Sequence, residues 1–210
     1  MRTLAIAGTG TEVGKTYVTA RLRRGLPNAL ALKPVESGYI AEQSDARAIA
    51  DSDSWTAPLY HFEQGLSPHQ LARQAGVHIE SSRIKEWLVA AAKAANPEWL
   101  LVETAGGLLT PLDDAGLTNL ELARRIGVDG WILVAANRLG VLHDVSAALC
   151  AAQLVAWPPR AVVLSGSQRD LSSDHNTTEL ERLVAPLAVF EVRQDGELPP
   201  ELIELLLRAI

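Results

Sequence analysis

The sequence has little of what several classes of protein require. It contains a single cysteine, Cys150, among 210 residues, so no disulfide can form within the chain. No apolar run approaches the roughly 18 residues that a membrane span needs. The 19 lysines and arginines are outnumbered by 25 aspartates and glutamates, and this balance argues against a nucleic-acid surface, because phosphate contacts need clustered cations. We therefore expect a cytoplasmic protein whose partners are small molecules, with no nucleic acid and no membrane among them.

The scarce reactive side chains do not suggest a site of their own. Cys150 lies in the apolar helical stretch 149–152, so we expect it to fill the core rather than to act as a nucleophile or ligand. No metal-ligand spacing is present among the histidines, which are His61, His69, His78, His143 and His175. We assign none of them a catalytic role and expect hydrogen-bonded or solvent-facing rings.

Short apolar runs alternate with helical patterns along the chain. The runs typical of strands buried on both faces of a parallel sheet are 3–7, 29–32, 99–102, 131–135, 161–164 and 187–192. The helical patterns are 17–24, 81–95, 118–125 and 141–155, and Pro68 and Pro200 stand where the first turn of a helix would begin. The alternation predicts one doubly wound α/β domain over residues 1–210, with a mainly parallel sheet, helices on both faces and ligands at the carboxyl ends of the strands. The polar segment 168–176 lacks periodicity, and we expect a mobile loop there.

A glycine-rich loop follows the first predicted strand. Gly8-Thr9-Gly10-Thr11-Glu12-Val13-Gly14-Lys15-Thr16 reads as the phosphate-binding loop of a P-loop NTPase, placed between a strand and a helix as that motif requires. Its backbone N–H groups would face phosphate oxygens, Lys15 would reach the β- and γ-phosphates, and the Thr16 hydroxyl would ligate Mg²⁺. The usual spacing puts a glycine at position 9, which is Thr9 here. A turn that binds nothing remains the alternative, which the intact Gly14-Lys15-Thr16 disfavours.

Polar residues also follow two further predicted strands. The second strand is followed by Lys33-Pro34-Val35-Glu36-Ser37-Gly38, although a lysine at a strand end is as often simply solvated. The third is followed by Glu103 and then Thr104-Ala105-Gly106-Gly107, which resembles a Walker B arrangement whose carboxylate meets the Mg²⁺ held by Thr16. For Asp45, after Ser44, the better explanation from the residues alone is a favourable charge at a helix start.

Taken in order, these motifs resemble those of the dethiobiotin synthetase family. The loop at 8–16 is similar to the family's G-T-x-T-x-V-G-K-T, which accounts for the displaced glycine, and 33–38 is similar to its K-P-V-x-S-G. The family's S-D-A, S-P-H and V-E-G-A-G-G match 44–46, 67–69 and 102–107, the last with one difference. The resemblance covers roughly residues 3–145.

This resemblance implies an ATP-dependent cyclo-ligase of biotin biosynthesis. Such an enzyme converts 7,8-diaminononanoate, CO₂ or bicarbonate and MgATP to dethiobiotin, ADP and phosphate: an amine captures CO₂ as a carbamate, the carbamate takes the γ-phosphoryl group, and the second amine closes the ring. The implied catalytic residues are Lys33, Lys15 and Thr11, and the implied Mg²⁺ ligands are Thr16, Asp45 and Glu103. Nucleotide contacts are implied for Glu12, Val13, Gly14, Lys15, Thr16, Tyr17, Asp45, Glu103, Gly106 and Ser165. Substrate contacts are implied for Ser37, Ala105, Gly106 and, near the interface of a homodimer, Leu139, Gly140, Val141 and Leu142.

The chain departs from the family pattern at three places. Thr104 replaces a glycine, Ser165-Gly166 replaces a common Asn-Asp that reads the base, and 191–195 lacks the usual Pro-Trp, so the nucleotide preference is open. Two other functions would share the loop and the sheet. An amidoligase related to the cobyrinate diamide synthases needs a glutamine-hydrolysing Cys/His pair or an ammonia-supplying partner, and a partitioning-type switch ATPase needs a second lysine early in the loop, where this chain has Gly8-Thr9-Gly10.

Overall fold

A computed structural model describes residues 1–50, 55–193 and 196–209. Its strands are β1 (Arg2–Gly8), β2 (Ala29–Leu32), β3 (Val35–Ser37), β4 (Tyr60–Phe62), β5 (Trp99–Gly107), β6 (Gly130–Ala136), β7 (Val162–Ser165) and β8 (Val189–Val192). Its α-helices are α1 (Lys15–Gly25), α2 (Asp45–Ile49), α3 (Pro68–Gln74), α4 (Ser81–Ala95), α5 (Asn119–Ile126), α6 (Val141–Leu154), α7 (Ser173–Val184) and α8 (Pro200–Ala209), and a short 3₁₀ turn, η1, covers Gly166–Gln168. Among these helices none combines the length and apolarity needed to cross a membrane.

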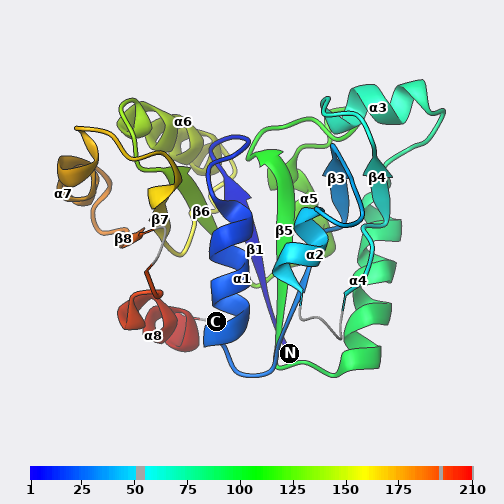
Figure 1. The fold of residues 1–210 in the computed structure, drawn as a ribbon, viewed down its shortest axis with the longest axis horizontal. Coiled ribbons are helices and arrows are strands. Elements are labelled where there is room, and N and C mark those ends of the chain that lie inside the picture. Colours follow the sequence, from blue (N-terminus) through cyan, green and yellow to red (C-terminus); the bar gives the residue numbers. More distant parts are fainter. Residues whose placement is uncertain (51–54, 194–195, 210) are drawn as a thin grey trace.

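The strands form a parallel sheet in the order β2-β5-β1-β6-β7-β8, and β3 pairs with β4 beside it (Figure 1). β1 lies at the centre, where Leu4 is in register with Leu101 of β5 and Gly130 of β6. Parallel strands all present their carboxyl ends at one edge of the sheet. The loop after β1, Lys33 after β2 and the end of β5 therefore meet at that edge.

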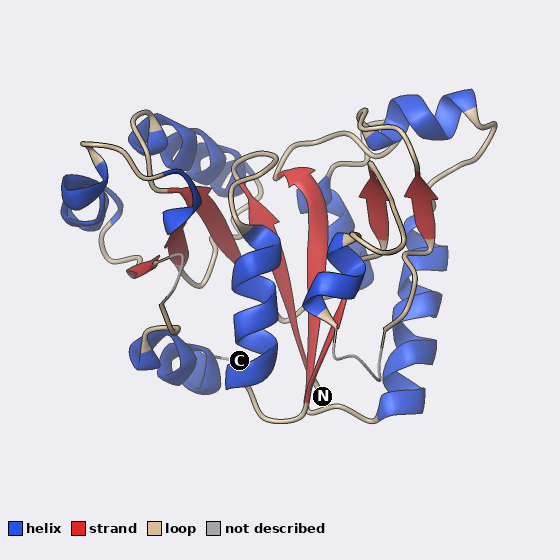
Figure 2. Cartoon of the chain, viewed as in Figure 1, coloured by secondary structure: helices blue, strands red, loops and turns tan. Residues whose placement is uncertain are grey.

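Both faces of the sheet are largely buried. Alternate residues of each strand point to opposite faces, so each strand contributes side chains to two clusters. On β1, Leu4 and Ile6 pack in a cluster with residues of α1 and α8, whereas Ala5 and Ala7 pack in a second cluster with residues of α4, α5 and α6. Helices consequently cover both faces, with α1 crossing the centre of one (Figure 2). The expected doubly wound α/β sheet of P-loop type is confirmed.

Most predicted elements agree with the structure within a few residues. Helix 81–95 is reproduced as α4, and Pro68 and Pro200 open α3 and α8. Two expectations were wrong. Residues from Ser173 to Asn176 form the first turn of α7 instead of a mobile loop, since both of these side chains are buried and hydrogen-bonded to Asn137. Cys150 is exposed rather than part of the core, because it lies on the outer face of α6.

Candidate active site

The phosphate-loop motif forms a tight turn into α1. Glu12 and Gly14 have φ values of 59° and 91°, and the Glu12 value is uncommon for a residue with a side chain. Within the described residues no side chain caps the start of α1, so its first N–H groups are available to an anion. The Lys15 Nζ atom donates to the Gly10 carbonyl across the loop at 2.8 Å. Burial lowers the pKa of Lys15 to about 8; the Glu103 carboxylate opposes this and the Lys33 ammonium adds to it.

Lys33 lies between two carboxylates at the edge of the sheet. Its Nζ atom donates to Glu103 Oε1 at 2.9 Å and also forms an ion pair with Asp45. Burial alone would lower the pKa of Lys33, which is 5% exposed, but Glu103 and Asp45 together raise it above its usual value. Burial would raise the pKa of Asp45, but the Lys33 ammonium, the Thr16 hydroxyl and Lys15 together lower it below its usual value. Lys33 is therefore a buried, paired cation rather than the simple solvated lysine that the sequence left open.

Glu103 connects this cluster to the phosphate loop. It lies within β5, which runs on to Gly107, rather than after the strand as we expected. The Thr16 hydroxyl donates to Glu103 Oε1 at 2.9 Å, while Glu103 Oε2 is buried without a hydrogen-bond partner among the described residues. An orphaned carboxylate oxygen beside a hydroxyl and a second carboxylate is a set of hard oxygen donors, as Mg²⁺ requires. The described residues contain no cluster of three or more acidic, histidine or cysteine ligands.

The turn at the end of β5 is fastened from two sides. Gly106 has a φ of 70°, and a Cβ atom there would come within 2.7 Å of the Thr110 hydroxyl, so only glycine fits. The buried Asn119 amide donates to the Ala105 and Gly107 carbonyls at 2.5 and 2.7 Å. The Thr110 hydroxyl accepts the Gly107 N–H at 2.8 Å. These bonds fix the backbone on both sides of Gly106.

Thr104, which stands where the family has a glycine, does not disturb this turn. It continues the extended backbone of β5, and its hydroxyl donates to the Ile6 carbonyl of β1 at 3.2 Å. The position therefore does not need a positive φ, and the side chain adds a bond between the two central strands.

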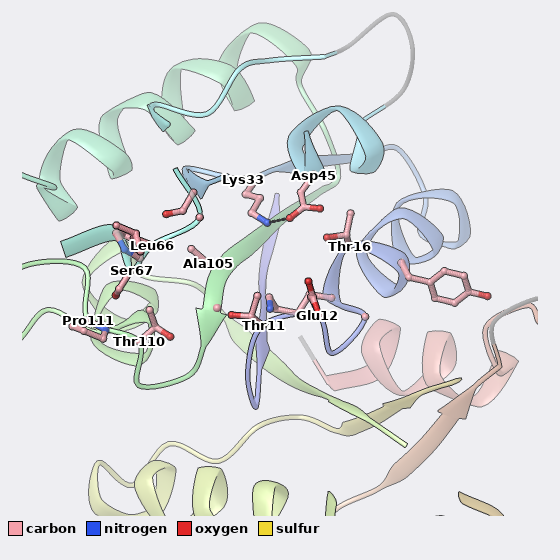
Figure 3. A pocket seen from close by; sticks show the side chains of 17 residues that line it. Thr11, Glu12, Thr16, Lys33, Asp45, Leu66, Ser67, Ala105, Thr110 and Pro111 are labelled. Atoms are coloured by element: carbon pink, nitrogen blue, oxygen red, sulfur yellow. Dashed lines mark hydrogen bonds and ion pairs between the residues drawn. The ribbon is translucent and has the colours of Figure 1, made fainter. Parts of the chain in front are cut away.

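These elements surround one cavity of about 710 Å³. Figure 3 shows Thr11, Glu12 and Thr16 on one side, Lys33 and Asp45 above, and Leu66, Ser67, Thr110 and Pro111 opposite. The predicted site residues that line the cavity are Thr11, Glu12, Gly14, Lys15, Thr16, Tyr17, Lys33, Ser37, Asp45, Ala105 and Gly106. Val13 is buried beneath the loop, and Glu103 lies under Thr16 and Lys33.

The remaining predicted residues do not line this cavity. Ser165 ends β7 and is buried. Residues 139–142 form the start of α6, where Leu139 is 75% exposed and its N–H donates to Asp170. Two residues of the 191–195 segment, Gln194 and Asp195, lie outside the described residues.

Sequence reasoning missed the residues that support the site. Glu36 and Asn119 were assigned no role, although both are buried and hydrogen-bond to site backbone. The sequence does contain a signal for Glu36. It precedes Ser37 in an extended segment, so its side chain must point to the face opposite the Ser37 side chain, away from the cavity. Asn119 follows the Thr118 cap of α5 and carries no comparable signal.

The site can be compared with known proteins. A family model described as an AAA domain matches residues 2–201. An ATP-dependent dethiobiotin synthetase from Anaeromyxobacter dehalogenans (strain 2CP-C) is 35% identical over 210 residues, covering 93% of this chain and 92% of that protein. The chain belongs to the ATP-dependent dethiobiotin synthetase family. A second dethiobiotin synthetase, from Rhodopirellula baltica, is 31% identical and covers 90% of this chain and 83% of its own.

Solved structures support the fold of this dethiobiotin synthetase family member. A plasmid partition protein from Borrelia burgdorferi aligns with a TM-score of 0.58 and 11% identity, covering 100% of this chain and 99% of the other. The MinC:MinD cell division complex of Aquifex aeolicus aligns with a TM-score of 0.54 and 12% identity, covering 100% and 86%. At such identities the likeness concerns the architecture alone. The family membership makes the chain an ATP-dependent enzyme.

Proposed function

We propose that this enzyme carboxylates 7,8-diaminononanoate and closes its ureido ring, forming dethiobiotin with ATP as the energy source. The observation that carries the proposal is the position of Lys33, a buried cation between Glu103 and Asp45 in the cavity that begins at the phosphate loop. The family membership supports the same reaction.

The charges of the site suit the proposed steps. A carbamate and the γ-phosphate must approach each other although both are negative, and the transferring phosphoryl group spreads charge over its oxygens. Lys33 places a cation beside that path, and bound phosphates would favour the charged form of Lys15 next to it; burial of both side chains strengthens their effect. We assign Lys33 to the carbamate and γ-phosphate, Lys15 to the nucleotide phosphates, and the Thr11 and Ser37 hydroxyls to the carbamate or transferring group. The Ser37 hydroxyl is buried without a partner among the described residues, so it is free to serve this role.

The residues present fit a magnesium ion. We assign Thr16, Asp45 and Glu103 as its protein ligands. When bound, Mg²⁺ would neutralise charge on the nucleotide phosphates. The Asp45 and Glu103 carboxylates also balance the charge of Lys33.

The far side of the cavity suits the rest of the substrate. Leu66 and Pro111 give it apolar surface opposite the phosphate loop, and Pro68 also lines the cavity; this surface matches the hydrocarbon chain of a diaminononanoate. The Ala105–Gly106 backbone lies between the two ends. Residues 139–142 lie outside the cavity, and we propose that in a homodimer they approach the substrate carboxylate of the other subunit. The start of α6, which no described side chain caps, would favour an anion there.

The proposal is tested by measuring ATP use and product together. With 7,8-diaminononanoate and bicarbonate, ADP, phosphate and dethiobiotin should form in equal amounts, and omission of either substrate should abolish ATP use. A matched acceptor that lacks one of the two amino groups should yield no ring. ATP hydrolysis that is indifferent to the diamine, or ADP formed without a ureido product, would contradict the proposal.

A further inference from the structure

Glu36 is a buried carboxylate that the proposed chemistry does not use. It is 4% exposed and lies in the middle of β3, next to Ser37. Successive side chains of a strand point to opposite faces. Ser37 lines the cavity, and Glu36 points away from it toward α2. Burial raises the pKa of Glu36, although the Lys33 ammonium and two backbone N–H groups oppose the rise.

Both oxygens of Glu36 are occupied by the start of α2. Oε1 accepts the Asp45 N–H at 2.8 Å and Oε2 accepts the Ala46 N–H at 3.1 Å. The next N–H, that of Arg47, donates to the Ser44 hydroxyl at 3.1 Å. A helix of one or two turns is not stable in isolation, because its first N–H groups lack partners and nucleation is costly. The position of α2 thus depends on these caps.

The first residue of α2 is the one that reaches the cavity. The backbone N–H of Asp45 is held by Glu36, while its side chain forms the ion pair with Lys33. The Asp45 side chain is 46% exposed, so little packing restrains it. Its direction is therefore set by its backbone, by Lys33 and by a hydrogen bond with the Thr16 side chain.

We propose that Glu36 is a positioning residue that holds Asp45 in place beside Lys33 and thereby strengthens binding of the magnesium nucleotide. The proposal rests on the nucleotide site of the proposed function, and it does not depend on which acceptor is carboxylated. It follows that Glu36 acts through Asp45 and has no effect once the Asp45 carboxylate is gone.

The test measures MgATP binding by titration calorimetry with no amine and no bicarbonate present. Glu36→Ala should weaken MgATP binding about tenfold and raise the Mg²⁺ concentration needed for half-saturation. Glu36→Gln keeps one acceptor oxygen and should give a smaller loss, about threefold. Because the readout is nucleotide binding, a failure here is distinguishable from failure to form dethiobiotin.

A double-mutant cycle separates positioning from general stability. In an Asp45→Asn background, Glu36→Gln should change MgATP affinity by less than about twofold, since the carboxylate it positions is absent. Asp113 offers a matched control, because its carboxylate also accepts two backbone N–H groups, from Ala115 and Leu117, and does not touch Asp45. Asp113→Ala should lower the melting temperature and leave MgATP affinity unchanged.

Two results would overturn the proposal. One is wild-type MgATP affinity in both folded Glu36 variants. The other is additivity of Glu36→Gln and Asp45→Asn, which would show that Glu36 acts on the whole domain. Where Glu36→Ala does not fold, Glu36→Gln alone decides between these outcomes.

Discussion

Replacing Lys33 with glutamine removes a cation that the structure keeps permanently charged. The Glu103 and Asp45 carboxylates outweigh burial and hold the pKa of Lys33 above its usual value, so the ammonium persists at every pH at which the enzyme would work. Removing one preorganised electrostatic partner of a transition state typically costs about 2.7–4 kcal/mol, or about 10²–10³ in kcat. We therefore expect Lys33→Gln to lower kcat by about a hundredfold or more. ATP affinity should change little, because Lys15 and the loop N–H groups hold the phosphates in the ground state.

The same substitution also affects stability, and the two effects can be separated. Glu103 is 0% exposed and would lose its cation, and breaking a buried pair in this way costs about 3–5 kcal/mol. Asp45 is half-exposed and contributes little to that cost. The free energy of unfolding should fall in Lys33→Gln and recover in the double variant Lys33→Gln/Glu103→Gln, whereas kcat should not recover.

Steady-state formation of ADP and dethiobiotin gives kcat, and urea unfolding gives the stability. A folded Lys33→Gln variant with kcat within tenfold of the wild type would refute the role of Lys33 in the reaction. A low kcat that returned in the double variant would show that the loss came from misfolding of the site.

Three further predictions follow from the site. Glu103→Gln and Asp45→Asn should each raise the Mg²⁺ concentration for half-maximal activity, because an amide donates less charge to a hard cation; an unchanged Mg²⁺ titration would make that residue structural. ATP should be preferred over CTP by no more than about tenfold in kcat/KM, since Ser165 is a short, buried residue outside the cavity; a preference above about a hundredfold would reveal an adenine pocket elsewhere. Asn119→Ala should raise the KM for the diamine more than that for ATP, because it frees the carbonyls beside Gly106; equal changes in both would assign Asn119 to the phosphate loop, on which Gly107 packs.

The parts of the fold that the sequence predicts are those set by local pattern. The six strands of the main sheet are largely apolar runs, because both faces of the sheet are largely buried, and Ser81–Ala95 has the period of a helix. The small sheet of β3 and β4 was missed, since each strand has three residues and its pairing depends on a long connection. The polar start of α7 was taken for a loop because its buried Ser173 and Asn176 are satisfied by the distant Asn137, which no local pattern reveals.

The site residues likewise divide into those that local motifs indicate and those that only the folded chain reveals. Lys15, Thr16 and Lys33 were found because their motifs lie at strand ends, and the topology brings strand ends together. Asp45 could not be decided from sequence, since only the folded chain shows its carboxylate on Lys33. The ligand contacts of all the proposed site residues, Ser165 and residues 139–142 among them, stay predictions.

The central place of β1 has a consequence for how the chain acquires its function during synthesis. This strand has neighbours on both sides, and they begin far downstream, at Trp99 of β5 and Gly130 of β6. Contacts between such distant segments form slowly, because closing the long loop between them costs conformational entropy before the contacts are made. A nascent chain that ends within α4 already contains every residue of the phosphate loop, yet it has neither of the strands that hold the loop in shape. We therefore expect the loop, although translated early, to bind a nucleotide only after both later strands have joined the sheet.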